Sequence, residues 1–200
     1  MNQYLLDTQF ATSELIKIII FEENEMRNLK SKYKEKKSQH DLLYRDFIRK
    51  ELDPDENFTE GQMMQSFYMQ SKYYLEILQP IIEEIKILER SINIKDGSIR
   101  ALSGALLQIA KQGISVVYRG LSGCPDGRII KNESLKNIIW QARNQSIHYE
   151  ESKFSPAVVS CFNNLQFASL SNINMAKDIF NLIGWNDYCD YEDDMVSLLG

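Results

Sequence analysis

The chain has 200 residues, of which 44% are hydrophobic and 26% charged, as expected for one globular domain with a sizeable buried core. Its formal net charge of −5 excludes a protein that binds polyanions over its whole surface, so a nucleic-acid site has to be a local basic patch. Three cysteines without a C-x-x-C spacing and only two histidines argue against a disulfide framework and against a zinc site built on histidine.

The sequence carries neither a membrane span nor an export signal. Its longest apolar run, at residues 15–21, is interrupted by Lys17 and is far too short to cross a bilayer. The first residues, MNQYLLDTQF, lack the basic start of a signal peptide. We therefore expect a cytoplasmic protein with reduced thiols, no contact with membranes, no metal and no other cofactor.

Residues 12–51 follow helical periodicity and predict a long N-terminal helical arm, apolar in its first half and charged in its second. This is long for a globular helix, so a break or a helical hairpin is an alternative. The sequence Asp-Pro-Asp at 53–55 should end the helix, because proline disfavours helical geometry in the residue before it. Thr59 and Gln62 then predict the capping box of a second helix, which Pro80 should kink or split.

A polar turn ending in Asp-Gly is predicted at 93–97, before a third helix over about 98–118. Small residues along this third helix should let it lie close to its neighbours, so we place it at the centre of the fold. The glycine-rich segment 120–127 lacks the spacing and the lysine of a phosphate-binding loop, and we interpret it as a connection.

Three further helices and an acidic tail complete the chain. A fourth helix is predicted over 132–151, with Asn132 or Ser134 as its N-cap. A fifth begins at Pro156, with Ser155 as its cap, and a sixth covers about 172–183. Residues 185–200 are expected to form a solvated acidic tail. Because no segment alternates with strand periodicity for long, we predict an all-α fold in a single domain spanning 1–200.

The fourth helix carries the stretch IIWQARNQSIHYEE at 138–151, with the pattern R-N-x-x-x-H formed by Arg143, Asn144 and His148. Arginine offers a permanently charged planar fork for phosphate oxygens. Histidine can accept and release a proton near neutral pH, as general acid–base catalysis requires. These residue types in this order therefore indicate chemistry on a phosphate group.

A helical wheel indicates which side of this helix is functional. With Arg143 at zero, one core stripe lies between roughly 220° and 320°. Asn144 and His148 lie together on the opposite, polar side, whereas Trp140 and Ile147 lie outside the core stripe and predict a partner surface. Arg143 and His148 are about 140° apart, too far to act on one phosphate from a single chain. The predicted core stripe comprises Leu135, Ile138, Ile139, Ala142, Ser146 and Tyr149.

This signature on a helix of an all-α chain resembles that of the HEPN superfamily, many of whose members are metal-independent RNases of bacterial defence and toxin–antitoxin systems. The resemblance implies a HEPN-like helical bundle whose signature helices pair across a two-fold axis. Arg143, Asn144 and His148 would then cleave single-stranded or loop RNA in a composite cleft, with Trp140 and Ile147 at the homodimer interface. The protein would act as a toxin or abortive-infection effector.

The resemblance also implies a regulator, either a cognate antitoxin or a nucleotidyltransferase. In HEPN toxins silenced by a nucleotidyltransferase, a tyrosine two residues after the histidine accepts the nucleotide. That position is Glu150 here, so control by this route is not expected. Two alternatives of other classes stay open: a non-catalytic HEPN module that binds nucleotide, RNA or a partner, and a helical scaffold or antitoxin-like protein. In the simplest competing interpretation, Arg143 pairs with Glu150 or Glu151 and His148 is merely solvated.

Additional RNA contacts are predicted from basic residues outside the fourth helix. Residues 27–37 carry six basic residues and one acid, which could follow an RNA backbone or could equally be a solvated arm. Arg119 and Arg128 flank the glycine-rich segment and could face the cleft, although a role as surface arginines is the alternative. The lysines predicted to contact RNA are Lys30, Lys32, Lys34, Lys36 and Lys37.

Overall fold

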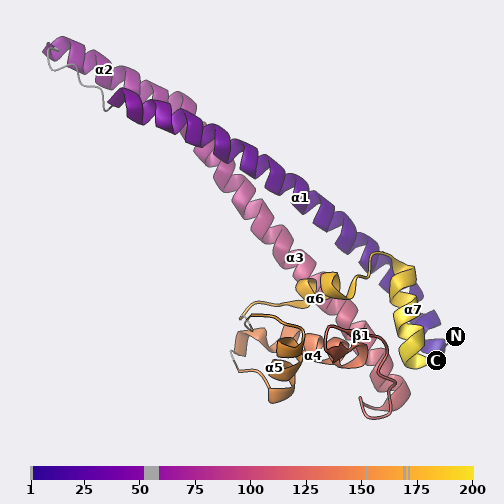
Figure 1. The fold of residues 1–200 in the computed structure, drawn as a ribbon. Coiled ribbons are helices and arrows are strands. Elements are labelled where there is room, and N and C mark those ends of the chain that lie inside the picture. Colours follow the sequence, from indigo (N-terminus) through magenta and orange to yellow (C-terminus); the bar gives the residue numbers. More distant parts are fainter. Residues whose placement is uncertain (1, 52–58, 152, 169, 171) are drawn as a thin grey trace. The chain divides into compact units, whose positions relative to one another are not determined.

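The structure, a computed structural model, describes residues 2–51, 59–151, 153–168, 170 and 172–200. It is all-α with a long N-terminal helix, as predicted, and its strands form a single short antiparallel pair within the described residues (Figure 1). The elements are α1 (Gln3–Glu51), α2 (Glu60–Tyr73), a π-helical turn η1 (Tyr74–Leu78), α3 (Gln79–Tyr118), β1 (Ile129–Ile130), β2 (Glu133–Ser134), α4 (Leu135–His148), a 3₁₀ turn η2 (Tyr149–Glu151), α5 (Pro156–Asn164), α6 (Ala176–Ile183) and α7 (Tyr188–Leu199).

The chain divides into two compact units, where a single domain was predicted. The first unit combines Met1–Glu23 with Gly97–Gly200, and the second is Asn24–Asp96. Helices α1 and α3 each contribute one end to each unit. None of the described helices is long and apolar enough to cross a lipid bilayer.

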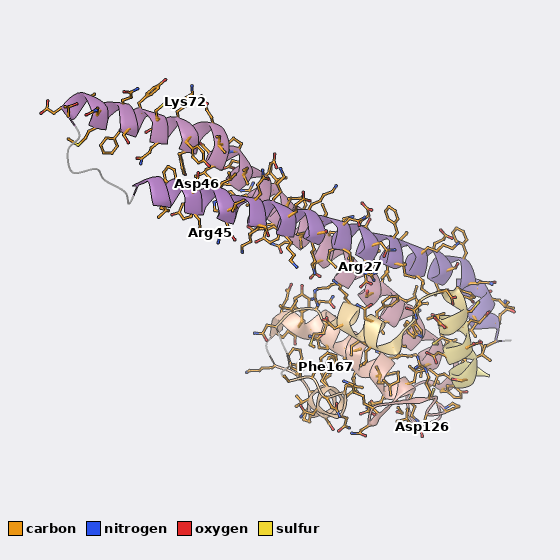
Figure 2. All side chains as sticks on the ribbon, turned by 45° about the horizontal axis from the view of Figure 1, so that its top comes forward. Arg27, Arg45, Asp46, Lys72, Asp126 and Phe167 are labelled. Atoms are coloured by element: carbon orange, nitrogen blue, oxygen red, sulfur yellow. The ribbon has the colours of Figure 1, made fainter. Side chains whose placement is uncertain are left out.

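The second unit is an antiparallel helical hairpin, one of the two arrangements that the length of the predicted arm allowed. The Nζ atom of Lys36 lies 2.6 Å from Glu84 Oε2, and the ring of Phe47 stacks on Tyr73 with 6.1 Å between centroids. Residue numbers therefore increase along α1 in the direction in which they decrease along the helices that return from α2 to α3, so the two sides of the hairpin are antiparallel. Charged side chains, among them that of Lys72 on α2, lie on this hairpin (Figure 2).

The returning helices begin and change geometry where the sequence predicts. Thr59 and Gln62 form the expected capping box, in which the Thr59 backbone N–H donates to Gln62 Oε1 at 2.9 Å. The π-helical turn η1 ends two residues before Pro80. Because proline has no backbone N–H to donate, the helical hydrogen-bond pattern changes there without a split in the helix. The predicted Asp-Pro-Asp stop at 53–55 lies outside the described residues.

The turn predicted at 93–97 is wrong, because α3 continues through it as regular helix. The less exposed positions keep helical spacing across the segment, from Leu88 through Ile92 to the fully buried Ile99. Gly97 costs such a helix about 1 kcal/mol relative to alanine. The free energy gained by burying this continuous apolar stripe outweighs the penalty of Gly97 and the turn preference of Asp96-Gly97.

In the first unit α3 occupies the central position that its small residues predicted. Leu106, Leu107 and Ile114 are fully buried. The absence of a side chain at Gly113 lets α1 pack closely, since a Cβ atom there would lie only 2.9 Å from the ring of Tyr4. Around α3 lie the start of α1 and the helices α4, α6 and α7, whereas α5 packs on α4, and the two chain ends lie next to each other (Figure 1).

The solvated acidic tail predicted for 185–200 is also wrong. Most of it forms α7, in which Tyr191, Met195 and Leu198 recur at helical spacing and are fully buried, together with Trp185 before the helix. The apolar stripe is hard to recognise in the sequence, because acidic residues stand between its members along the chain. Most of these acidic residues lie on the other side of the folded helix. The side-chain Nδ2 of Asn2 donates to the Leu199 carbonyl at 3.3 Å and joins the two ends of the chain.

Two glycines provide a matched test of this fold. Gly127 has φ +66°, and a Cβ atom there would lie 2.8 Å from Leu198 Cδ2, so Gly127→Ala should lower the free energy of unfolding by about 2 kcal/mol. Gly97→Ala should raise it by about 0.5–1 kcal/mol, because α3 is helical there with open space around the glycine. Urea unfolding of both variants measures these changes. Destabilisation by Gly97→Ala would contradict the continuous helix.

Candidate functional site

The candidate site is built on α4, which the preceding strands bring onto the core. β1 and β2 pair antiparallel, with Lys131 in a left-handed conformation between them, and Ser134 is the residue before the helix. The predicted core stripe of the helix is buried, except that Tyr149 lies beyond its end and is only half-buried. α4 ends at His148, three residues earlier than predicted.

Gln145 anchors the buried face of α4 in a way that the wheel did not predict. Its side chain is fully buried, donates to the Ile173 carbonyl at 2.8 Å and accepts from the Met175 N–H at 2.9 Å. A buried amide with both groups satisfied holds its helix in one orientation. The polar side of α4 is thereby fixed relative to the segment that leads into α6.

Helices α3 and α4 pack antiparallel with a defined register. A Cβ atom at Gly104 would lie 3.6 Å from Ser146 Oγ, so the two helices approach closely at this level. One turn further along α3, Gln108 Oε1 accepts a short hydrogen bond from Arg143 Nε. Another turn further, the ammonium of Lys111 lies 4.4 Å from the centroid of the Trp140 ring.

Arg143 is therefore oriented by two amide side chains. Besides the bond to Gln108, its NH1 group donates to Asn144 Oδ1 at 3.4 Å. The remaining N–H groups of the guanidinium are left for a ligand. The alternative in which Arg143 pairs with Glu150 or Glu151 is wrong, because Glu151 contacts His148 and Glu150 accepts from the Tyr149 hydroxyl.

Asn144 and His148 lie one turn apart and line the same cavity of about 340 Å³, which is in the size range of small-ligand sites. Asn144 also contacts Arg143 and so connects the arginine to the cavity. Phe154 and Lys153, from the segment after η2, bring an aromatic ring and a cation to the wall. Among the described residues, the lining comprises Asn144, His148, Glu151, Lys153, Phe154, Ser155 and Val158.

His148 is held by a carboxylate that the 3₁₀ turn brings back over it. Residues three apart eclipse each other in 3₁₀ geometry, and His148 Nδ1 lies 2.5 Å from Glu151 Oε1. When Nδ1 carries the proton, it donates to Glu151 and leaves Nε2 unprotonated as a base. The side chain of His148 is 49% exposed, so a substrate can reach it.

The two residues predicted at a dimer interface differ in their surroundings. Ile147 is 50% exposed and presents apolar surface to solvent. Trp140 is only half-buried, yet the Lys111 ammonium lies over its ring. Trp140 therefore already has a partner within its own chain, and Ile147 offers the more open apolar surface.

Arg128, predicted to contact RNA, stabilises the packing of α6 and α7. Its Nε and NH2 groups donate to the two carboxylate oxygens of Asp194 at 2.7 and 2.9 Å, and NH2 also donates to the Ile183 carbonyl at 2.6 Å. Asp194 is buried and accepts a further bond from Trp185 Nε1 at 2.8 Å. An RNA contact by Arg128 would compete with this bidentate pair.

The other cations predicted to contact RNA lie just after α3 and in the second unit. Arg119 is exposed just after α3, in a left-handed conformation with φ 60°. The five lysines from Lys30 to Lys37 belong to the second unit, where Lys36 pairs with Glu84 and the others are exposed. The structure therefore brings together Arg143, Asn144 and His148, whereas Gln108 and Lys111 join them from α3 without any motif that pointed to them.

Cys161 is not suited to act as a nucleophile. Its side chain is fully buried, and burial, reinforced by Glu133, raises the pKa of its thiol to about 12. Among the described residues, no three His, Cys, Asp or Glu side chains gather where they could hold a metal ion.

Comparisons with known proteins add no relative: no family model, no curated protein and no solved structure matches the chain. The resemblance to the HEPN superfamily accordingly stays a prediction that rests on the residues of α4 and on the all-α fold.

Breaking the pair between Arg128 and Asp194 should destabilise the fold. Asp194→Asn should lower the free energy of unfolding by about 2–3 kcal/mol, because it weakens three hydrogen bonds to a buried group. Arg128→Met should cost about 1–2 kcal/mol, since the arginine is half exposed. Denaturant unfolding measures both changes. If Arg128→Met left stability unchanged and weakened RNA binding, Arg128 would be an RNA contact instead of a structural residue.

Proposed function

We propose that the protein is a metal-independent endoribonuclease of the HEPN type that cleaves single-stranded or loop RNA. The observation that carries the proposal is the position of Asn144 between the other two signature residues. Arg143 donates to Asn144, and Asn144 lines a cavity together with His148. A phosphate clamp and a proton-transfer group thus lie on one helix, with Asn144 between them.

The reaction that suits these groups is attack by an RNA 2′-hydroxyl on the adjacent phosphorus. His148 Nε2 removes the hydroxyl proton while the Glu151 carboxylate holds the opposite ring nitrogen. A phosphorane with extra negative charge forms, and Arg143 stabilises that charge. The bond to the 5′-oxygen then breaks, and a protonated histidine donates a proton to this oxygen. The products are a 2′,3′-cyclic phosphate and a 5′-hydroxyl, with no water or metal consumed.

A second copy of the chain would complete this site. Arg143 and His148 are separated by about 140° around an ideal helix, and one histidine cannot serve as base and acid in the same step. Pairing of two α4 helices would bring together two arginines and two histidines. The half-exposed Ile147, one position before His148, provides apolar surface at the expected contact.

The biological role follows from the resemblance alone. An RNase of this kind would act in the cytoplasm as a toxin or as an abortive-infection effector. A cognate antitoxin or a nucleotidyltransferase would restrain it, the latter by a route other than modification of a tyrosine two residues after His148, because that position is Glu150.

The cavity beside His148 favours a second function, the binding of a nucleotide without cleavage. Phe154 could stack on a base and Lys153 could contact a phosphate, and both line the cavity. In this case the same α4 residues hold a ligand and do no chemistry on it.

Replacing His148 tests the enzyme directly. Purified protein in EDTA should degrade RNA, and His148→Ala should lower the rate by at least about 100-fold, because the proton-transfer group is lost. His40→Ala is the matched control, since His40 lies in the second unit next to Asp41 and should be dispensable. Circular dichroism and melting temperature establish that each variant is folded.

Two outcomes separate the proposed functions. Equal inertness of the wild type and His148→Ala on diverse RNAs would contradict the RNase. If the inert wild type still bound a nucleotide with micromolar affinity and His148→Ala did not, the binding function would stand in its place.

The composite site also predicts an oligomeric state. Ile147→Asp should convert a dimer into a monomer in sedimentation experiments and reduce RNase activity with it, because a charge would be placed at the apolar contact. Val116→Asp on α3 is the control, since Val116 is similarly exposed at 60% and lies outside the proposed contact. A wild-type protein that is monomeric and fully active would contradict the composite site.

A further inference from the structure

Two positively charged side chains meet where α3 packs on α4. Lys111 and Gln108 are three residues apart on α3, and Trp140 and Arg143 are three residues apart on α4. The antiparallel register places Gln108 against Arg143 and Lys111 against Trp140, one turn apart on each helix. The ammonium of Lys111 and the guanidinium of Arg143 are therefore neighbours on the same flank of α4.

Within the described part of the chain, neither of these two cations forms an ion pair with a carboxylate. Burial lowers the pKa of Lys111, and the charge of Arg143 lowers it further. Two like charges in a half-buried position repel each other unless an anion compensates them. Elsewhere in this unit partly buried cations do have an acidic partner, as in Arg100–Asp178 at 2.8 Å, Arg128–Asp194 at 2.7 Å and Lys136–Asp126 at 3.0 Å.

The uncompensated pair is held rigidly, as a binding site requires. The Trp140 ring lies 4.4 Å from the Lys111 ammonium and restrains the flexible lysine side chain by a cation–π contact. The amide of Gln108 fixes the guanidinium of Arg143 through its Nε, and NH1 donates to Asn144 Oδ1 at 3.4 Å, so that within the described residues the NH2 group has no hydrogen-bond partner. Both cations are thus positioned before a ligand arrives, and this lowers the entropy lost on binding.

We propose that Lys111 and Arg143 form a phosphate-binding site on the α3 side of α4, which takes a phosphodiester of the RNA backbone. The site rests on the proposed function, because RNA is the polyanion that the α4 signature would act on. It separates two roles along the helix: Lys111 and Arg143 hold phosphate on one flank, and His148 transfers protons at the cavity on the other. Trp140 and Gln108 are positioning residues that act through the two cations.

Binding of an RNA that cannot be cleaved tests this site separately from catalysis. The probe is a fluorescent single-stranded 2′-O-methyl RNA, which has no free 2′-hydroxyl for the attack. Lys111→Met should weaken its binding by about three- to tenfold and reduce the dependence of log Kd on log salt concentration by about 0.7, as loss of one phosphate contact predicts. Lys111→Arg should retain most of the affinity. Lys17→Met is the control, because Lys17 is an exposed lysine of the same unit that pairs with Glu14.

Lysine footprinting gives a second measurement that does not depend on the folding of a variant. Bound oligonucleotide should protect Lys111 from acetylation in the wild-type protein and should leave Lys17 as reactive as before. Equal reactivity of Lys111 with and without the oligonucleotide would overturn the proposal. Wild-type affinity and salt dependence in a folded Lys111→Met variant would overturn it as well.

The outcomes also distinguish this proposal from the proposed function. Lys111-dependent binding by a protein that cleaves no RNA would support the phosphate site and remove the RNase. Full RNase activity with an unchanged KM in Lys111→Met would support the RNase and overturn the phosphate site. Binding of AMP in preference to the oligonucleotide would overturn the assignment of the site to a backbone phosphodiester.

Discussion

The close antiparallel packing of α3 on α4 is the constraint on which the candidate site depends. Gly104 brings the two helices together at Ser146, and the register then sets Gln108 against Arg143 and Lys111 against Trp140. Without this approach Arg143 would be a mobile surface arginine. With it, the guanidinium has a fixed orientation, and a second cation stands beside it. The site is therefore a property of two helices, although its signature lies on one.

Features decided by local chemistry could be predicted from the sequence. Apolar spacing gave the all-α class and the buried stripe of α4, and the capping residues Thr59 and Ser155 marked the starts of two helices. Features decided by tertiary packing could not. The Asp96-Gly97 pair favours a turn by itself, but a continuous buried stripe keeps α3 helical through it. The composition of the acidic segment after Gly184 favours a solvated tail. The segment nevertheless forms α7 and packs on the core, and Arg128 compensates the charge of the buried Asp194.

The same distinction applies to the candidate site. Asn144 and His148 could be placed together because helical spacing alone decides that they share a face. Gln108 and Lys111 carry no motif, and only the register between α3 and α4 brings them to Arg143. The contact between His148 and Glu151 arises because α4 tightens into a 3₁₀ turn, a change of geometry that an ideal wheel does not contain.

The ends of the RNA fragments provide the most direct test of the central claim, that the side chains of α4 promote attack by a 2′-hydroxyl on its own phosphodiester. A labelled single-stranded RNA is incubated with the protein in EDTA, and the termini of the products are identified by mass spectrometry. We expect fragments that end in a 2′,3′-cyclic phosphate and begin with a 5′-hydroxyl. Intact RNA, or fragments with a 5′-phosphate produced by attack of water, would contradict it.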